Sequence, residues 1–569
     1  MKFFFEHFEV LADAPNGIKK LRELILQLAV MGKLVPQDPD DEPAGVLLEK
    51  IKEEKERLIK AGEIRNHKPI PKITEEEMPY EIPKSWKWSR LHDIGLINPR
   101  NSAQDDLDAS FVPMPLISAE YGVKVQSEKR LWKEIKNGYT HFKENDVSLA
   151  KITPCFENGK STVMRGLKNG IGAGTTELHV FRPILSTISP DYVLIYLKSP
   201  KFINEGIPRM TGSAGQKRVP KEYFAENPFP LPPTLEQKRI VSKVDRLMAF
   251  CDELEKNKEK RESKRISLNN ACLDKLLSSR EPEEFQEHWQ RIVDHFDILY
   301  HHPGNVAKLK QAILQLAVMG KLVPQDPDDE PAEVLLEKIK QEKEQLIKEG
   351  KIKRQKPLPP ITEDEKPFEL PKGWEWVRLG DITKKLGAGS TPRGGKAVYR
   401  NKGVKFLRSQ NVWNEGLRID DVAYITEKIH ENMSGTHVKP GDILLNITGA
   451  SIGRSAVVPD DFDEGNVSQH VSIVRLVEKS SKAFIHLAII SPYIKDMVFS
   501  VQVGISREGL SMSRLQFFPI PFPTLNEQKR IAAKVEQLLS LCDRLAERLQ
   551  EADSKRDKLF QAVVNQVLD

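Results

Sequence analysis

Residues 25–44 read ILQLAVMGKLVPQDPDDEPA, and residues 313–332 read the same twenty letters. A second repeated signature, Glu-Gln-Lys-Arg-Ile, occurs at 236–240 and again at 527–531. Between these matched ends lie two middle stretches of about 150 residues that have little in common. A period this long excludes solenoids and propellers. The sequence therefore predicts one frame built twice around two different middles.

The length and composition set the broad class of the protein. The 569 residues can hold several domains, and each half is long enough to bury its own core. The apolar start, Met1–Phe5, is interrupted by Glu6 and His7, which is unlike a secretory signal, and no run approaches the ~18 apolar residues that span a membrane. The four cysteines form no Cys-x-x-Cys pair, which is typical of reduced thiols. We expect a cytoplasmic protein.

The formal net charge of +5 is unevenly divided along the chain. The first middle, residues 86–235, holds 20 Lys/Arg against 15 Asp/Glu, and the second, residues 374–525, holds 19 against 15. The remaining frame is therefore slightly acidic. This division favours a polyanion as the partner of the middles and proteins as partners of the frame. Ordinary scatter of charge can give a similar split, so it serves only as support.

Local patterns predict helices in the frame and sheets in the middles. Apolar residues at helical spacing predict helices at 18–32 and 44–61, each stopped by a glycine, and the second copy repeats them. Residues 65–85 contain four prolines, which predicts an extended linker. Each middle opens with a Trp-x-Trp pair and then alternates β-branched runs with turns, which predicts a sheet-dominated domain. The clearest expected strands are 111–118, 146–152, 177–182, 404–407, 442–447 and 471–476.

A long helix is expected after each middle, starting at the Glu-Gln-Lys-Arg signature. Apolar residues at alternating steps of four and three form a heptad seam, which is typical of a coiled coil. At 1.5 Å per residue, roughly 40 residues make a helix of about 60 Å. Such a helix needs a packing partner that buries its apolar stripe. We expect the two helices to pair as antiparallel rods; the alternative is that each packs on its own domain. The predicted spacer residues are Ile240, Val244, Leu247, Leu254, Leu268, Ile531, Val535, Leu538, Leu545, Leu549 and Leu559.

These patterns together predict an α+β protein with a pseudo-two-fold internal duplication, in which two sheet-dominated domains are separated by a coiled-coil-like helical spacer. The expected parts are a helical region with a Pro-rich linker (1–85), the first middle (86–235), a central region with a long helix, a helical pair and a linker (236–373), the second middle (374–525) and a C-terminal long helix (526–569).

No catalytic centre is visible in the sequence. The closest approach to a phosphate-binding loop, residues 156–162, lacks the first glycine, and Gly394-Gly395-Lys396 is followed by Ala397 where a Ser or Thr should bind magnesium. No glycine-rich adenosylmethionine loop follows an expected strand, no histidines and cysteines pair at metal-ligand spacing, and no nucleophile elbow occurs. The sequence therefore predicts a non-catalytic chain without a metal or cofactor of its own.

The middles instead offer basic, glycine-rich loops with interspersed aromatic residues. Between Thr383 and Asn414 there are eight Lys/Arg and no acid. Lys and Arg supply phosphate contacts, while Arg, Gln and Asn can pair with base edges. For any single residue a solvated loop is the more ordinary explanation, and the pattern counts only in aggregate. The predicted DNA-contacting residues are Lys160, Thr175, Thr176, Arg209, Gln216, Lys217, Arg218, Arg393, Lys396, Arg400, Arg408, Gln410, Asn411, Arg454, Gln469 and His470.

These features resemble the specificity subunit of a Type I restriction–modification enzyme, of the subfamily with larger specificity subunits and long duplicated blocks. The resemblance covers essentially all 569 residues. It rests on the duplicated GKLVPQDPDDEPA block, on Pro83–Trp88 and Pro371–Trp376 ahead of the middles, and on Pro-Leu-Pro-Pro or Pro-Phe-Pro-Thr before Glu-Gln-Lys-Arg-Ile. Gly-Ser-Thr-Pro at 389–392 and Gly-Ala-Ser-Ile-Gly-Arg at 449–454 are similar to features of that family's target-recognition domains.

The resemblance implies that each middle is a target-recognition domain for one half of a split, asymmetric DNA site. It implies that the helical pair fixes the unread gap and docks two modification subunits for adenine methylation, with restriction subunits joining for cleavage. S-adenosylmethionine, ATP and Mg would then be bound by those partners. One departure from the family pattern lies in the long helix expected after residue 236. In the middle of its heptad seam, the charged residues Lys258, Arg261 and Arg265 replace apolar ones.

Two other classes of protein remain open from the residues alone. One is a scaffold whose middles bind proteins or peptides, and the basic glycine-rich loops count against it. The other is a nuclease or methyltransferase, and the missing motifs count against it.

Overall fold

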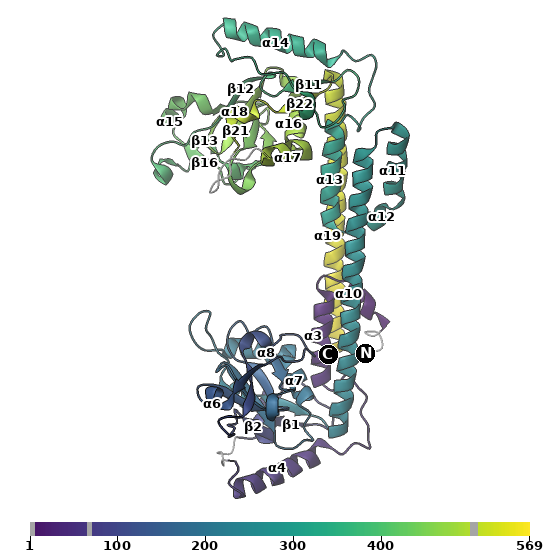
Figure 1. The fold of residues 1–569 in the computed structure, drawn as a ribbon, viewed down its shortest axis with the longest axis vertical. Coiled ribbons are helices and arrows are strands. Elements are labelled where there is room, and N and C mark those ends of the chain that lie inside the picture. Colours follow the sequence, from purple (N-terminus) through teal and green to yellow (C-terminus); the bar gives the residue numbers. More distant parts are fainter. Residues whose placement is uncertain (1–5, 65–70, 501–509, 569) are drawn as a thin grey trace. The chain divides into compact units, whose positions relative to one another are not determined.

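The computed structural model describes residues 6–64, 71–500 and 510–568 (Figure 1). The chain forms two compact units. Unit 1 comprises residues 1–262 and 552–569, and unit 2 comprises residues 263–551. Each unit contains one α+β domain and helices packed beside it, so the predicted α+β fold with an internal duplication is confirmed. Among the described residues, no single helix has both the length and the apolar composition needed to cross a membrane.

The repeated blocks form the same helices in both copies. The first copy forms α2 (Phe8–Ala12), α3 (Gly17–Val30) and α4 (Ala44–Lys60), and the second forms α12 (Phe296–Leu299), α13 (Pro303–Val318) and α14 (Ala332–Lys348), preceded by α11 (Pro282–Asp294). The two helices predicted ahead of the linker are therefore confirmed. Gly32 and Gly320 follow α3 and α13 with φ of +71° and +70°. Glycine adopts these left-handed values without strain, which ends each helix.

Helix α10 (Thr234–Ser278) begins in unit 1 and runs antiparallel to α3. Two ion pairs establish this direction. Asp13, just before α3, pairs with Arg261 at 2.7 Å, whereas Arg22, within α3, pairs with Asp252 at 2.6 Å. The charged seam position Arg261 thus has a carboxylate partner at the start of α3.

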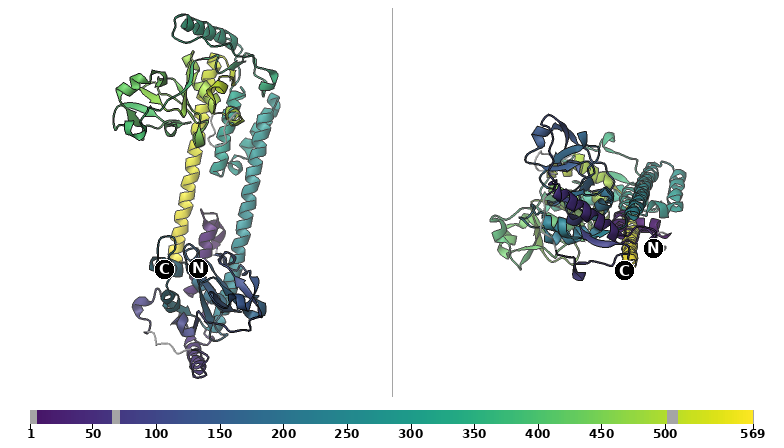
Figure 2. Two further views of the ribbon diagram at one scale, coloured as in Figure 1. Left: turned by 60° about the vertical axis from the view of Figure 1, so that its left-hand side comes forward. Right: turned by 90° about the horizontal axis from the view of Figure 1, so that it is seen from below.

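Helix α19 (Leu525–Leu568) ends in unit 1 and runs parallel to α3. Lys20 pairs with Asp557, and Lys33 donates to the carbonyl of Leu568 at 2.5 Å. The last turns of α19 therefore lie beside α3, as both Figure 1 and Figure 2 show. Because α3 is antiparallel to α10 and parallel to α19, the two long helices are antiparallel within unit 1.

Unit 2 has the same arrangement, with the start of α19 in the place that the start of α10 takes in unit 1, and the end of α10 in the place of the end of α19. Helix α13 runs parallel to the end of α10 and antiparallel to the start of α19. The contacts that fix these directions are Lys308 with Asn270, Lys321 with Ser279, Lys310 with Asp543, and Gln325 with Glu527. Each unit therefore combines the first part of one long helix with the last part of the other, in the expected antiparallel directions. The contacts that fix these directions run through α3 in unit 1 and α13 in unit 2, each of which contacts both long helices.

The predicted seam is buried at the start of each long helix and shifts by one position further along. Ile240, Val244, Leu247, Ile531 and Val535 are buried, and Leu254, Leu538, Leu545 and Leu549 are partly buried against the same cores. Leu268 and Leu559 lie outside the stripe with 44% and 52% exposure, while their neighbours Asn269 and Phe560 are buried. An α-helix drifts by about 20° per heptad relative to a strict 3.5-residue repeat, which moves the buried face to the next residue.

A buried carboxylate joins each repeated block to the start of a long helix. Glu236 has no exposed surface and accepts hydrogen bonds from Trp86 Nε1 at 2.9 Å and from Gln37 Nε2 at 2.6 Å. Burial raises the pKa of this carboxyl. Beside it, Arg239 pairs with Asp41. In unit 2 the same contacts are made by Glu527, Trp374, Gln325, Arg530 and Asp329.

Both middles fold with the same strand order. One four-stranded sheet in the first middle has the order β2 (Gly95–Ile97), β9 (Leu178–Pro183), β6 (Val147–Ala150), β7 (Ser161–Val163), and in the second middle β12 (Thr383–Ala388), β21 (Val471–Leu476), β18 (Ile443–Asn446), β19 (Ser455–Val457). The other has the order β4 (Glu128–Leu131), β3 (Asp108–Val112), β8 (Ile171–Gly174), β5 (Thr140–Lys143), matched by β16 (Ala423–Ile425), β13 (Val404–Leu407), β20 (Gly465–Val467), β17 (His437–Val438). In both copies this second sheet contains one parallel pair, β3 with β8 and β13 with β20.

Short strands and helices close each domain against the frame. The strand pairs are β1 (Lys87–Arg90) with β10 (Pro228–Leu231) and β11 (Glu375–Arg378) with β22 (Pro519–Phe522), and the core helices are α7 (Pro190–Lys198), α8 (Pro200–Gly206), α16 (Lys482–Ile490) and α17 (Pro492–Ser500). Each of the predicted strands overlaps an observed strand. The expected strand at 111–118 is short because Pro113 and Pro115 follow Val112, where β3 ends.

A buried ion pair occupies the same place in both domains. Asp146, just before β6, accepts two hydrogen bonds from Arg182 of β9 at 2.8 and 2.7 Å. Asp442, just before β18, accepts two from Arg475 of β21, both at 2.7 Å. Each carboxylate also accepts the backbone N–H of the residue three positions earlier. The two middles thus keep one scaffold although most of their residues differ.

Replacing Glu236 with alanine leaves the buried donors of Trp86 and Gln37 unpaired, and we expect the free energy of unfolding to fall by about 1–3 kcal/mol. Glu527→Ala removes the equivalent carboxylate of unit 2 and should have a similar effect. Denaturant titration followed by circular dichroism measures both changes. Glu53→Ala, at an exposed position of α4, is the control and should change little. Wild-type stability in the Glu236→Ala variant would contradict a linking role for this carboxylate.

Candidate nucleic-acid interface

Three loops of the first domain meet at one end of the sheet that contains β6 and β9. The N–H of Lys151, just after β6, donates to the carbonyl of Glu177 at 2.9 Å, and its own carbonyl accepts from Val219 at 2.8 Å. The N–H of Thr153 donates to the carbonyl of Lys217 at 2.9 Å. We call the surface formed by residues 151–160, 175–177 and 211–219 the first loop surface.

The first loop surface collects most of the predicted residues of this domain. Thr175 and Arg218 are both held by Glu177: the hydroxyl of Thr175 accepts the Glu177 N–H, and Arg218 makes a bidentate ion pair with the carboxylate at 2.8 and 2.9 Å. The Arg218 guanidinium lowers the pKa of Glu177. Arg218 therefore braces the loops with its charge already partnered. The predicted residues left exposed here are Thr176, Gln216 and Lys217.

Lys160 and Arg209 have different positions relative to this surface. Lys160 closes the loop after β6, where its carbonyl accepts the N–H of Ala150 at 2.9 Å. Arg209 lies 5.0 Å over the ring of Tyr223 and lines a different pocket, which also contains Glu76, Glu77 and Glu222. The structure therefore brings the backbone of Lys160 to the first loop surface, while its ammonium donates to the carbonyl of Met114 at 3.4 Å. It leaves Arg209 among carboxylates.

The second domain gathers its loops at the equivalent end of the sheet that contains β18 and β21. The N–H of Ile447, just after β18, donates to the carbonyl of His470 at 3.0 Å. The side-chain amide of Asn446 donates to the carbonyl of Ser409 at 2.8 Å. We call the surface formed by residues 408–421, 447–454 and 468–470 the second loop surface.

Hydrogen bonds within the second loop surface fix the positions of three of its predicted DNA-contacting residues, Arg408, Gln410 and Asn411. Asn411 is 2% exposed; its amide oxygen accepts the N–H of Arg408 and its amide nitrogen donates to the carbonyl of Arg418, both at 2.9 Å. Arg408 donates to the carbonyl of Asp421, and Gln410 donates to the Asp421 carboxylate at 2.7 Å. Asn411 thus orders the loop from within, whereas Gln410 is exposed through the remainder of its side chain.

The remaining predicted residues of the second domain differ in how they are held. His470 Nδ1 lies 2.6 Å from the Thr448 hydroxyl, which orients the ring, and Gln469 is exposed beside it. Arg393 is exposed, and Arg400 donates to the carbonyls of Ala397 and Tyr399. The side chain of Lys396 lies outside the described residues.

Two arginines enclose one tryptophan on the second loop surface. The guanidinium of Arg418 lies 3.7 Å from the ring centre of Trp413, and that of Arg454 lies 3.9 Å from it. Two guanidinium groups at these distances would overlap if they shared one face, so they lie on opposite faces of the indole. We call this group the arginine sandwich. Arg454 directly precedes β19, as Lys160 directly precedes β7.

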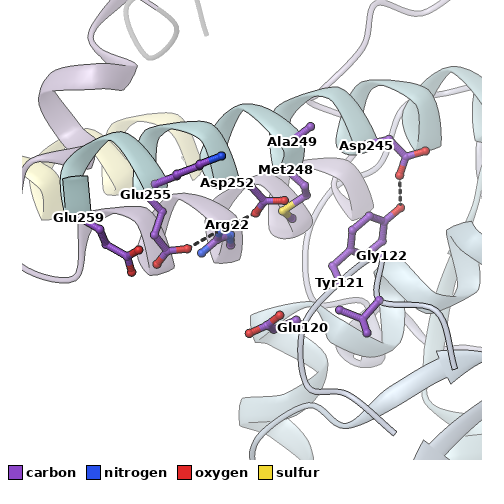
Figure 3. Close-up of a pocket in the computed structure, with 12 residues that line it drawn as sticks. Arg22, Glu120, Tyr121, Gly122, Asp245, Met248, Ala249, Asp252, Glu255 and Glu259 are labelled. Carbon is purple, nitrogen blue, oxygen red and sulfur yellow. Dashed lines mark hydrogen bonds and ion pairs between the residues drawn. The ribbon is translucent and has the colours of Figure 1, made fainter. Parts of the chain in front are cut away.

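One acid-lined cavity of unit 1 has the wrong charge for DNA. About 490 Å³ in volume, it lies between α3, α10 and the loop at Tyr121 (Figure 3). Its lining carboxylates are Glu120, Asp245, Asp252, Glu255 and Glu259. The hydroxyl of Tyr121 donates to Asp245 at 2.8 Å, which ties this loop of the domain to α10. A phosphate backbone is repelled by such a lining, so this cavity is not a candidate DNA-binding site.

Sequence reasoning missed two cations, Lys151 and Arg418. Lys151 lies near the end of the expected strand 146–152 and directly follows β6, so its place at a strand end was a usable signal. Arg418 lies across the short hairpin of β14 (Val412–Trp413) and β15 (Gly416–Leu417), diagonally opposite Trp413. Diagonal neighbours on one face of a hairpin contact each other when the side chains are long.

A family model described as the Type I restriction modification DNA specificity domain matches the chain twice, at residues 83–262 and 371–552. The chain is 43% identical over 560 residues to the Type I restriction enzyme EcoAI specificity subunit of Escherichia coli, which covers 96% of this chain and 94% of the relative. The chain belongs to the Type I restriction–modification specificity subunits. Another member, the Type I restriction enzyme EcoEI specificity subunit of Escherichia coli, is 42% identical over 568 residues, covering 97% and 94%.

A solved structure titled "Structural basis underlying complex assembly and conformational transition of the type I R-M system" shares the fold of this specificity subunit. It has 18% sequence identity and a TM-score of 0.51, and the match covers 86% of this chain and 99% of the other. The two segments matched by the family model run from the proline ahead of each Trp-x-Trp pair to the middle of the following long helix. One family domain therefore combines an α+β domain with the first part of a long helix.

His179 gives the first loop surface of this specificity subunit a dependence on pH. Its Nε2–H donates to the carbonyl of Val219 at 3.1 Å, and its ring stacks on Phe224. Burial lowers the pKa of His179 to about 4, below the ~6.5 of a free histidine. Because the folded pKa is the lower one, we expect stability to fall as the pH drops from about 6.5 to about 4, by a total of about 3 kcal/mol.

This expectation is measured as the free energy of unfolding across that pH range. His179→Gln lacks the titrating group and should lose most of this part of the slope. The matched control is His301→Gln, at an exposed position of unit 2, which should keep the wild-type slope. An unchanged slope in the His179→Gln variant would show that other groups carry the acid sensitivity.

Proposed function

We propose that this specificity subunit is the non-catalytic DNA-recognition component of a Type I restriction–modification complex. Residues 86–235 and 374–525 act as its two target-recognition domains, and each reads one half of a bipartite, asymmetric DNA site. One observation carries the proposal: two domains of the same strand order gather unlike loops at the same end of the same sheet. A shared scaffold with different loops suits two readers of different sequences.

The exposed side chains support unlike half-sites. The first loop surface exposes Thr176, Gln216 and Lys217, whereas the second exposes Gln469 beside an oriented His470. Base edges in the major groove are distinguished by the pattern of donors and acceptors that meet them. Different donors and acceptors on the two domains therefore favour different half-sites, with each mismatched base pair reducing binding by ~1–3 kcal/mol.

The charge of the chain supports shared DNA binding with partner subunits. Each domain has only a small excess of Lys/Arg, and two of the predicted contacts, Arg218 and Arg408, already have partners within the domain. Phosphate neutralisation sets the salt-dependent part of DNA affinity. We expect the isolated chain to bind DNA weakly and the modification subunits to supply the rest of the affinity.

The duplicated frame supports two copies of one partner. Val46 on α4 and Val334 on α14 occupy equivalent positions and are 43% and 39% exposed. We propose that two modification subunits dock on the frame, with restriction subunits completing the assembly in the cytoplasm. S-adenosylmethionine, ATP and Mg are then bound by those partners. The seam residues of α10 and α19 act as the spacer that sets the number of unread base pairs.

Two exposed glutamines provide a matched test of the two readers. Gln216→Ala should relax the specificity of one half-site and Gln469→Ala that of the other, because a good bidentate amide–base contact contributes ~1–3 kcal/mol of discrimination. Mapping methylated adenines in cells that carry the complete system measures both halves at once. If both variants alter the same half, the two domains do not read separate half-sites.

Inserting one heptad into both long helices tests the spacer. Seven residues after Glu262 and seven after Glu551 preserve the buried faces and lengthen each helix by about 10 Å, close to three base pairs of B-form DNA. We expect both half-site sequences to be kept and the unread gap to grow by about three base pairs. Insertion into α10 alone should abolish recognition. An unchanged gap in the double insertion would end the spacer proposal.

A further inference from the structure

We propose that the arginine sandwich, Arg418–Trp413–Arg454, is a phosphate-binding site that grips the DNA backbone beside the half-site read by the second domain. The proposal rests on the DNA-recognition function proposed above and assigns one part of the second loop surface to the backbone instead of the bases. Its two guanidinium groups lie 3.7 and 3.9 Å from one indole ring.

The sandwich is held in place before any ligand arrives. Trp413 Nε1–H donates to the carbonyl of Gln410 at 2.8 Å, which fixes the plane of the ring. The carbonyl of Arg418 accepts from the buried Asn411 amide at 2.9 Å. The carbonyl of Arg454 accepts the N–H of Asn446 at 2.8 Å. Stacking on the indole then restricts both guanidinium groups, so little side-chain freedom remains to be lost on binding.

The two cations lack counterions. Among the described residues, neither Arg418 nor Arg454 lies within ion-pair distance of a carboxylate, and neither guanidinium donates a hydrogen bond to a side chain or carbonyl. Arg475 of the same domain, by contrast, is fully engaged by Asp442. Two like charges held on opposite faces of one ring repel each other, and a phosphate bound to each guanidinium relieves this repulsion. A guanidinium fork matches the oxygens of a phosphate.

The equivalent position of the first domain favours a phosphate over a base. Lys160 directly precedes β7 as Arg454 directly precedes β19. The carbonyl of each accepts the N–H of the last residue of the strand opposite, which is Ala150 of β6 or Asn446 of β18. A lysine ammonium is a point charge that suits phosphate and lacks the planar fork of arginine. A cation at the same place in two domains of unlike loops fits the part of DNA that is alike in every sequence.

Salt dependence of binding tests the proposal in the complex assembled with its modification subunits, using a short duplex that carries the methylated site. Arg418→Gln and Arg454→Gln should each lower the slope of log affinity against log salt concentration by about one, and the double variant by about two. The methylated sequence should stay unchanged, because phosphate contacts carry no sequence information. Trp413→Leu should weaken binding while both charges remain.

Lys428→Gln is the control, since it removes one exposed positive charge from α15 (Glu427–Asn432) of the same domain. The salt-dependence slope of the Lys428→Gln complex should match that of the wild type. If this slope falls as much as in Arg418→Gln or Arg454→Gln, the loss comes from long-range charge, and the proposed site is wrong. A change of half-site sequence in Arg418→Gln or Arg454→Gln would make them base readers and also overturn it. A wild-type complex that does not prefer its site over random DNA would contradict the proposed DNA-recognition function itself. That result is distinct from the two results above, which contradict only the phosphate-binding site. Thermal unfolding verifies that each variant is folded.

Discussion

The carboxylate of Glu236 joins the parts of the first copy of the frame, and its counterpart Glu527 joins the same parts of the second copy. Neither has appreciable exposed surface, so each needs hydrogen-bond donors from the protein. Those donors are an indole and an amide from the repeated block and its Trp-x-Trp pair, while the carboxylate itself opens the long helix. A buried acceptor with this many partners tolerates few substitutions, which explains why the residues around it repeat and those between do not.

Inside each domain, too, the residues that maintain the fold are different from the residues on the loop surface. The Asp146–Arg182 pair joins β9 to the start of β6, the Asp442–Arg475 pair joins β21 to the start of β18, and the strand order is shared. Loops at the end of the sheet then differ without changing the strands below them. A specificity subunit built in this way can acquire a new half-site by changing loop residues, since the contacts that determine the fold lie elsewhere.

Sequence patterns were informative wherever a residue's environment depended on near neighbours. The helices at 18–32 and 44–61 and the strands at 404–407 and 471–476 follow directly from local periodicity and agree with the structure. The heptad seam identified the long helices, but not the shift from Leu268 to Asn269 or from Leu559 to Phe560, because small angular drift accumulates along a helix. The candidate site was predicted less completely. Thr176, Gln216, Lys217 and Gln469 are exposed on the loop surfaces, whereas Arg209 lines another pocket and Asn411 is buried.

The sequence by itself determined that the chain is a duplicated frame around two unlike sheet domains, because repeated letters and local periodicity require no knowledge of distant contacts. It also carried the family resemblance, whose marks lie in contiguous stretches. Only the tertiary structure decided which loop residues are available to a ligand. Arg218 is neutralised by Glu177, forty-one positions earlier, and Trp413 is enclosed by Arg418 and Arg454 from two different hairpins. The physical reason is that the charge and exposure of a loop side chain depend on groups brought to it by the fold, and groups such as Glu177 and Arg454 are remote in the chain from the residues they contact.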